Sequence, residues 1–182
     1  FMGVSNDNTD EALKINANKD KYCGLKIFMG SSTGNMLVDN THTLSRIFSE
    51  SEVLIATHCE SEAIIKANKE KFKEADHARF HPIIRDVEAC YNSSQLAIEL
   101  AKKYNTRLHI LHISTANETH LFDGHLPLKE KRITAEVCVH HLSFKDSDYE
   151  SLGNLIQCNP AIKSAIDQAA LWEALLDNRL DI

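Results

Sequence analysis

Three side chains that could take part in metal chemistry lie within or directly after apolar runs of the sequence. Lys26 lies in GLKIFMG, His58 ends VLIATH, and His112 lies in LHILHIS. Imidazole nitrogens are common ligands of zinc and other transition metals. A lysine in an almost continuously apolar run needs a partner for its charge or an environment that removes the charge. Together the three residues predict a transition-metal site.

Each of these residues also has an ordinary explanation when it is considered alone. A histidine at the end of a strand is commonly a hydrogen-bonded core or surface residue. Lys26 could equally form an ion pair in the interior of a barrel. The metal site therefore depends on whether the fold brings the three side chains together.

The elements that would position them alternate along the chain. Each apolar run is followed by a segment with helical periodicity, and this alternation predicts βα units with right-handed crossovers and a parallel sheet. The predicted strands cover 23–29, 53–58, 107–113, 133–139 and 154–158, and the predicted helices cover 9–19, 40–51, 61–75, 83–104, 115–122 and 164–178.

The polar residues at the strand ends favour a barrel over an open doubly wound sheet. The sequence contains no GxGxxG after a strand, and GSSTG at 30–34 lacks the GK[ST] ending of a phosphate-binding loop. Several strands instead end on a histidine or an acid, as expected at the catalytic face of a (β/α) barrel. No linker-like segment interrupts the chain, so we expect residues 1–182 to form the central portion of one barrel domain, with about five parallel strands.

Composition limits the classes of partner. The 182 residues are 43% hydrophobic and 25% charged, with a net charge of −6 and interspersed signs. This composition gives no basic stripe for nucleic acid, no polybasic membrane patch and no apolar run of membrane-spanning length. The five cysteines are widely spaced without a CxxC pair, which is typical of reduced thiols in a cytoplasmic protein. We therefore expect a cytoplasmic protein that acts on a small molecule.

The order of five motifs resembles a known family over essentially the whole chain. GLKIFMGSSTGN, ATHCES, LHILHISTA, TAEVCVHHL and NPAIK are similar to segments of the class I dihydroorotases of the cyclic amidohydrolase superfamily. The resemblance implies a (β/α)8 TIM-type barrel with two zinc ions. It also implies the reversible cyclisation of N-carbamoyl-L-aspartate to L-dihydroorotate in de novo pyrimidine biosynthesis.

The resemblance assigns expected roles to residues of this chain. Lys26 stands where the family has a lysine whose carbon-dioxide-derived carbamate bridges the two zinc ions, and His58 and His112 match two histidines that ligate one of them. The resemblance also implies that the metals lower the pKa of a water molecule that bridges them. The hydroxide formed from this water would attack the cyclic amide. Asn159 matches a substrate-binding asparagine, although it could equally be a turn residue before Pro160.

Three further residues and one loop belong to the motifs. We expect Glu136, His140 and His141 to be structural or to support the ligands rather than to bind metal. Residues 31–34 are expected to form the flexible turn beside the carbamate.

Other parts of the family's site do not match any residue of this sequence. The resemblance places a metal-binding HxH before residue 1, and it places the aspartate that acts as general acid and base beyond Ile182. We therefore expect the chain to be a piece of a longer enzyme, inactive by itself, with a homodimer as the full-length form.

Two other functions remain open. Hydantoinases, dihydropyrimidinases and allantoinases share the carbamylated lysine and both histidines, but the hydantoinase type tends to carry a tyrosine shortly after the lysine, where this sequence has MGSS. A non-catalytic barrel that serves as a scaffold partner would be expected to lose the ligands. Because Lys26, His58 and His112 are all present, the sequence favours catalysis.

Overall fold

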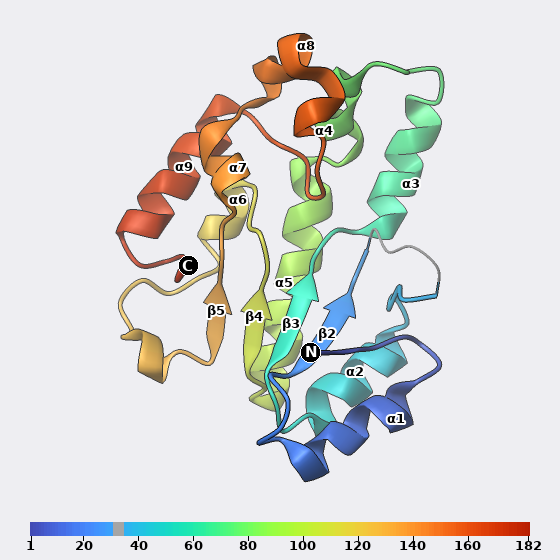
Figure 1. Cartoon of the computed structure of the whole chain (residues 1–182), viewed down its shortest axis with the longest axis vertical. Helices are drawn as coiled ribbons and strands as arrows, with labels where there is room; N and C mark the ends of the chain where they lie inside the picture. The colour runs from blue at the N-terminus through green and yellow to red at the C-terminus, as the bar shows by residue number, and fades with distance from the viewer. Residues whose placement is uncertain (31–34) are drawn as a thin grey trace.

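A single all-parallel sheet organises the chain. The computed structural model describes residues 1–30 and 35–182, and its sheet has the strand order β1-β2-β3-β4-β5 (Figure 1). Because the order follows the sequence without a reversal, each connection crosses to the neighbouring strand. The strands are β1 (Met2–Gly3), β2 (Leu25–Phe28), β3 (Ile55–His58), β4 (Leu108–Ile110) and β5 (Ile133–Ala135).

Helices connect the strands and pack on one face of the sheet. The two longest, α5 and α9, carry N-caps in which Asp86 and Ser164 accept backbone N–H bonds from the first turn. The α-helices are α1 (Thr9–Leu13), α2 (Thr41–Glu50), α3 (Glu62–Lys71), α4 (His81–Ile84), α5 (Val87–Tyr104), α6 (Ala116–Thr119), α7 (Val139–Ser143), α8 (Tyr149–Leu152) and α9 (Ala165–Leu176). Short 3-10 segments cover η1 (Lys14–Asn18), η2 (Ala78–Phe80), η3 (Leu128–Glu130), η4 (Asp146–Asp148) and η5 (Gly153–Ile156).

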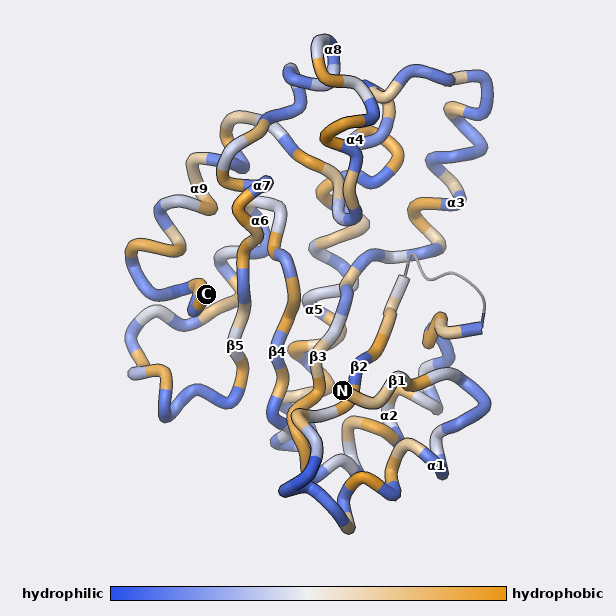
Figure 2. The backbone as a smooth tube through the Cα atoms, viewed as in Figure 1, coloured by the Kyte–Doolittle hydropathy of each residue, from blue (hydrophilic) through white to orange (hydrophobic). Residues whose placement is uncertain are grey.

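The two faces of the sheet differ in chemistry. On one face, Leu25, Ile27 and Ile55 are fully buried and belong to the same core as residues of α2 and α5. The apolar character of β2, β3 and β4 is visible along the chain trace (Figure 2). On the other face, alternation places Lys26 and Phe28, which are only half-buried. This asymmetry leaves a polar face on which functional side chains can gather.

The sequence predictions of a parallel sheet and of the main helices are confirmed. Sequential strand order and a single helix-packed core face are features of a (β/α) barrel, whereas a doubly wound sheet reverses its strand order. The predicted turn at 31–34 lies outside the described residues. No helix in the described parts of the chain combines the length and apolar character needed to cross a membrane.

One predicted strand is wrong and one strand was missed. The run 154–158 forms η5 and a loop instead of a strand, because Leu155 is 88% exposed while Ile156 packs with Tyr149 and Ile162 in a separate small cluster. The strand that was missed is β1, whose two residues pair with β2. A two-residue strand is too short to produce a detectable alternation pattern.

The buried face of the sheet should dominate the stability of the chain. We expect Ile27→Ala to lower the free energy of unfolding by about 2–5 kcal/mol, because it removes a fully buried strand side chain and leaves a cavity. Leu176→Ala, at a position 79% exposed, should change it by less than about 0.5 kcal/mol. Urea unfolding followed by circular dichroism measures both, and equal losses would contradict this description of the core.

Candidate metal centre

The register of the sheet places Lys26 and His58 on the same face. In the parallel pairing of β2 with β3, Lys26 lies beside Ala56 and Phe28 lies beside His58. Because side chains two residues apart share a face, all three side chains Lys26, Phe28 and His58 project from the polar face. The Nζ atom of Lys26 lies 4.2 Å from the centroid of the Phe28 ring, and the Phe28 and His58 ring centroids are 6.0 Å apart.

His112 reaches the same place by a different route. Strand β4 ends at Ile110, and His112 follows with a left-handed φ of 44°. A continued strand would have placed it on the face opposite to His109, but the positive φ turns the chain. As a result the Nε2 atom of His112 lies 3.1 Å from the Nδ1 atom of His58. The structure therefore brings the two predicted histidines together, and their role as ligands stays a prediction.

The spacing of the two nitrogens fits a shared metal ion. Two imidazole nitrogens bound to one tetrahedral zinc at 2.0–2.1 Å would be about 3.3 Å apart, close to the 3.1 Å between His58 and His112. Burial, with smaller contributions from the charges of His58 and Lys26, lowers the pKa of His112 to about 3. His112 is therefore neutral near pH 7, which is the state that binds metal.

A buried carboxylate fixes the orientation of His58. The Nε2 atom of His58 lies 3.0 Å from Glu60 Oε2, and Arg85 Nη1 donates to the same oxygen. Burial alone would raise the pKa of Glu60, but the hydrogen bond from His58 and the charge of Arg85 outweigh it and lower the pKa to about 2. Because an ionised carboxylate only accepts, Nε2 of His58 must donate, and the lone pair of Nδ1 faces His112 Nε2. Metal-binding histidines are commonly held in this way.

The sequence analysis missed Glu60 and Arg85. The signal for Glu60 was present in ATHCES, where an acid follows the histidine by two residues. Arg85 lies 25 residues further along and carries no local signature, so only the fold shows that it reaches Glu60.

The side chain of Lys26 has a lowered pKa and is therefore partly deprotonated near neutral pH. Burial lowers its pKa to about 8, despite small opposing contributions from Cys59 and Glu136. Its Nζ donates to the carbonyl oxygen of Ile27 at 3.4 Å, and it makes no ion pair with any described residue. The ion-pair explanation for Lys26 therefore finds no partner in the described part of the chain. A neutral amine fraction at physiological pH is what carbamate formation requires.

His109 and Glu136 form a second polar pair on the same face. His109 Nε2 lies 3.1 Å from Glu136 Oε2, and its Nδ1 lies 2.8 Å from the Thr134 hydroxyl. The sequence analysis gave His109 no special role and expected Glu136 to be structural or supporting. In the structure Glu136 orients His109.

The loop after His112 is anchored by a buried carboxyl group. Glu118 of α6 is 2% exposed, and it accepts hydrogen bonds from the Ser94 hydroxyl at 2.6 Å and the Thr115 hydroxyl at 2.9 Å. Burial raises the pKa of Glu118. Ser94 lies on α5, so this contact ties the turn that contains His112 to the helix layer.

Asn159 lies beside the support of the centre. It is exposed, and it lines a small cavity together with His81, Arg85 and Cys158. Arg85 in turn holds Glu60, so Asn159 is close to the residues that orient His58. Its predicted part in substrate binding stays a prediction.

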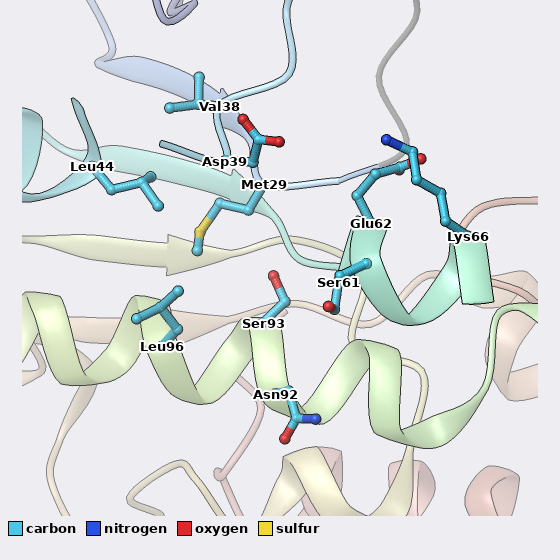
Figure 3. Close-up of a pocket in the computed structure, with 11 residues that line it drawn as sticks. Met29, Val38, Asp39, Leu44, Ser61, Glu62, Lys66, Asn92, Ser93 and Leu96 are labelled. Atoms are coloured by element: carbon cyan, nitrogen blue, oxygen red, sulfur yellow. The ribbon is translucent and has the colours of Figure 1, made fainter. Parts of the chain in front are cut away.

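A groove on the helical side is separate from the candidate centre. It measures about 500 Å³ and lies where the end of β2 meets α2, α3 and α5 (Figure 3). Met29, Leu44 and Leu96 give it apolar walls, and Lys66 lies at its rim. None of Lys26, His58 and His112 lines it.

Removing the carboxylate of Glu60 should weaken metal binding without removing a ligand. We expect Glu60→Gln to lower zinc affinity by about 10- to 100-fold, because the amide no longer enforces the tautomer of His58. Competition with a chromogenic chelator measures the affinity. Glu74→Gln, at an exposed position, is the control and should leave it unchanged. Equal affinities in the two variants would show that Glu60 does not support the centre.

The amine of Lys26 should become reactive at unusually low pH. Since burial lowers its pKa to about 8 from 10.5, the neutral fraction should rise through pH 8 in the metal-free protein. Carbamylation of Lys26 by cyanate, followed by peptide mass spectrometry, should therefore have its midpoint near pH 8. The exposed Lys145 is the reference lysine in the same peptide map. Identical pH profiles for the two lysines would disprove the lowered pKa of Lys26.

Comparison with curated proteins finds relatives named allantoinases. No family model matches the chain. An allantoinase of Escherichia coli O9:H4 (strain HS) is 28% identical over 138 residues, and an allantoinase of Deinococcus radiodurans is 29% identical over 138 residues. These alignments cover 70% and 71% of this chain but only 28% and 29% of the relatives. The chain thus spans less than a third of the length of these relatives.

Solved structures agree at the level of the fold. The L-hydantoinase (dihydropyrimidinase) from Arthrobacter aurescens superposes with a TM-score of 0.86 and 25% identity, and covers 98% of this chain and 40% of its own. A dihydroorotase from Campylobacter jejuni superposes with a TM-score of 0.58 and 18% identity, covering 93% of this chain and 44% of its own. The partial-barrel prediction is confirmed by these neighbours. Together, the sequence relatives and the L-hydantoinase superposition agree with the resemblance of the sequence motifs to the cyclic amidohydrolase superfamily.

Proposed function

We propose that the protein containing this chain is a metal-dependent hydrolase of cyclic amides. The observation that carries the proposal is the pair of His58 and His112 nitrogens, 3.1 Å apart, with Glu60 behind His58 and the low-pKa amine of Lys26 nearby. The names of the sequence relatives support the same reaction class.

The residues of the chain would hold two zinc ions. Lys26 would react as a free amine with carbon dioxide, releasing one proton, and the resulting carbamate would bridge the ions. His58, through Nδ1, and His112, through Nε2, would ligate one of them. When bound, the metals supply a Lewis acid for the amide carbonyl and lower the pKa of a water.

The other described side chains would prepare the site. Glu60 and Arg85 keep the Nε2 proton of His58 in place, so that the lone pair faces inward. Burial keeps His112 neutral. His109, held by Glu136 and Thr134, provides a polar wall on the same face as Lys26.

Within this reaction class we propose L-dihydroorotate and N-carbamoyl-L-aspartate as the substrate pair. The support is the sequence resemblance, which includes Asn159 in NPAIK and the absence of tyrosine from GLKIFMGSSTGN. The second candidate is a hydantoin or allantoin, and the names of the allantoinases and of the L-hydantoinase favour it. The scaffold alternative would predict a protein that does not require metal.

A substitution in the full-length protein tests both levels of the proposal. We expect Lys26→Ala to reduce zinc content from two ions per chain and to lower turnover at least 100-fold, with partial rescue by a short carboxylic acid that replaces the bridging carbamate. Metal content is measured by elemental analysis, and ring opening of dihydroorotate, hydantoin and allantoin by absorbance. Lys145→Ala is the exposed control and should behave as wild type.

The outcomes separate the hypotheses. Metal content and turnover unaffected by Lys26→Ala would disprove the bridging role of Lys26. Turnover of hydantoin or allantoin without turnover of dihydroorotate would select the second candidate.

A further inference from the structure

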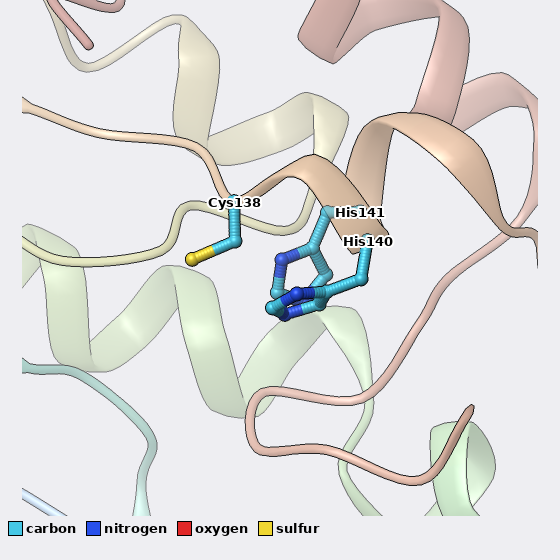
Figure 4. A group of neighbouring side chains, drawn as sticks. All are labelled: Cys138, His140 and His141. Carbon is cyan, nitrogen blue, oxygen red and sulfur yellow. The ribbon is translucent and has the colours of Figure 1, made fainter. Parts of the chain in front are cut away.

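A group of side chains that carry possible metal-ligand atoms lies after strand β5. Cys138, His140 and His141 each offer a ligand atom, and these atoms all lie within 4.8 Å of one another (Figure 4). Cys138 is the N-cap residue of α7, and the two histidines belong to that short helix. In Figure 4 the imidazole rings of His140 and His141 lie next to each other, and the side chain of Cys138 lies beside them.

The hydrogen bonding of His141 leaves one nitrogen available. Its Nε2 lies 3.0 Å from the carbonyl oxygen of Pro160. A carbonyl oxygen only accepts, so Nε2 carries the proton and Nδ1 is a bare lone pair. His141 is 3% exposed, and its Nδ1 has no hydrogen-bond partner among the described residues. A buried acceptor without a partner is costly.

This arrangement is the one that metal-binding histidines usually have. A ligating imidazole commonly donates its other N–H to a backbone carbonyl or a carboxylate, which fixes the ring and the tautomer. Pro160 does this for His141. Burial also lowers the pKa of His141 to about 4, so the ring is neutral near pH 7.

The donor set selects the kind of ion. One cysteine sulfur and two imidazole nitrogens suit zinc and similar borderline divalent ions, and three protein ligands leave a fourth position open. Around a tetrahedral zinc the sulfur–nitrogen distance is about 3.5 Å, so the atoms within 4.8 Å would have to move by about 1 Å. Cys138 and His140 are partly exposed at the start of a helix of five residues and can rotate toward the buried His141.

We propose that Cys138, His140 and His141 bind one zinc-like divalent ion, with none of Lys26, His58 and His112 among its ligands. The ion would be the missing partner of His141 Nδ1. It would join the start of α7 to the segment that contains Pro160, since His141 contacts that segment through its other nitrogen. The sequence analysis expected His140 and His141 to be structural or supporting, so this proposal departs from that expectation.

Cobalt(II) binding tests the proposal, because a thiolate ligand gives a charge-transfer band in the ultraviolet that histidine and carbamate ligands do not. The background protein carries Lys26→Ala, His58→Ala and His112→Ala, so that the first centre is removed. We expect this protein to bind one cobalt ion per chain with a thiolate band. Adding Cys138→Ser should abolish the band and lower the affinity at least tenfold.

Matched cysteine variants identify the ligand. Cys23→Ser removes an exposed thiol and should leave the band unchanged. Cys158→Ser is the stricter control, because its sulfur lies 4.0 Å from His141 Nε2, the nitrogen that bonds Pro160. A band that survives Cys138→Ser, a band lost in Cys158→Ser alone, or no band at all would overturn the proposal.

A second measurement tests the proposal if the triple variant used as the background does not fold. In the otherwise unaltered protein, Cys138→Ser alone should reduce the bound cobalt by one ion per chain with an unchanged circular dichroism spectrum, and an undiminished cobalt content would overturn the proposal. Because these readouts concern metal binding at Cys138, they do not depend on whether the protein hydrolyses dihydroorotate.

Discussion

The contact of the Glu60 carboxylate with both His58 and Arg85 is the interaction on which the candidate centre depends. Glu60 is fully buried, and an ionised carboxylate in that position needs positive or N–H partners to offset the loss of water. Arg85 supplies the positive charge, and His58 supplies the N–H donor. The end of β3, the connection after it and the segment before α5 must all be in place for these three groups to meet. The tautomer of His58 is therefore a property of the tertiary structure rather than of its own strand.

One face of the sheet contributes to the stability of the core, and the other face carries the polar side chains of the candidate centre. Leu25 and Ile27 point into the helical layer and carry the core, while Lys26 between them points to the polar face. Neighbouring residues of one strand can therefore have opposite requirements. Burial lowers the pKa of Lys26 although its side chain lies on the polar face. This division allows a reactive amine in a strand whose other side chains are entirely apolar.

The fold and the placement of the candidate residues on or after the strands could be predicted from the sequence, because apolar runs and strand-end polar residues are local signals. Lys26 and His58 were found in this way, and the sheet places them on one face. His112 was also selected from the sequence, although strand alternation did not explain how it could face His58; its positive φ did. Arg85 could not be found, since its partner is distant in sequence. The run at 154–158 was assigned to a strand because apolar residues packing in a small separate cluster look the same in sequence as residues of a sheet.

The anchoring of α6 by Glu118 has a consequence for how this scaffold could vary. Ser94 and Thr115 hold Glu118, so the backbone from His112 to the end of α6 is fixed to the helix layer. The chain that follows, from His120 to Lys131, is largely exposed. Insertions or deletions there would be absorbed at the surface, whereas a single added residue between His112 and Glu118 would change the direction of the imidazole. Homologous enzymes could thus acquire different loops at this end of the sheet while the histidine geometry stays constant.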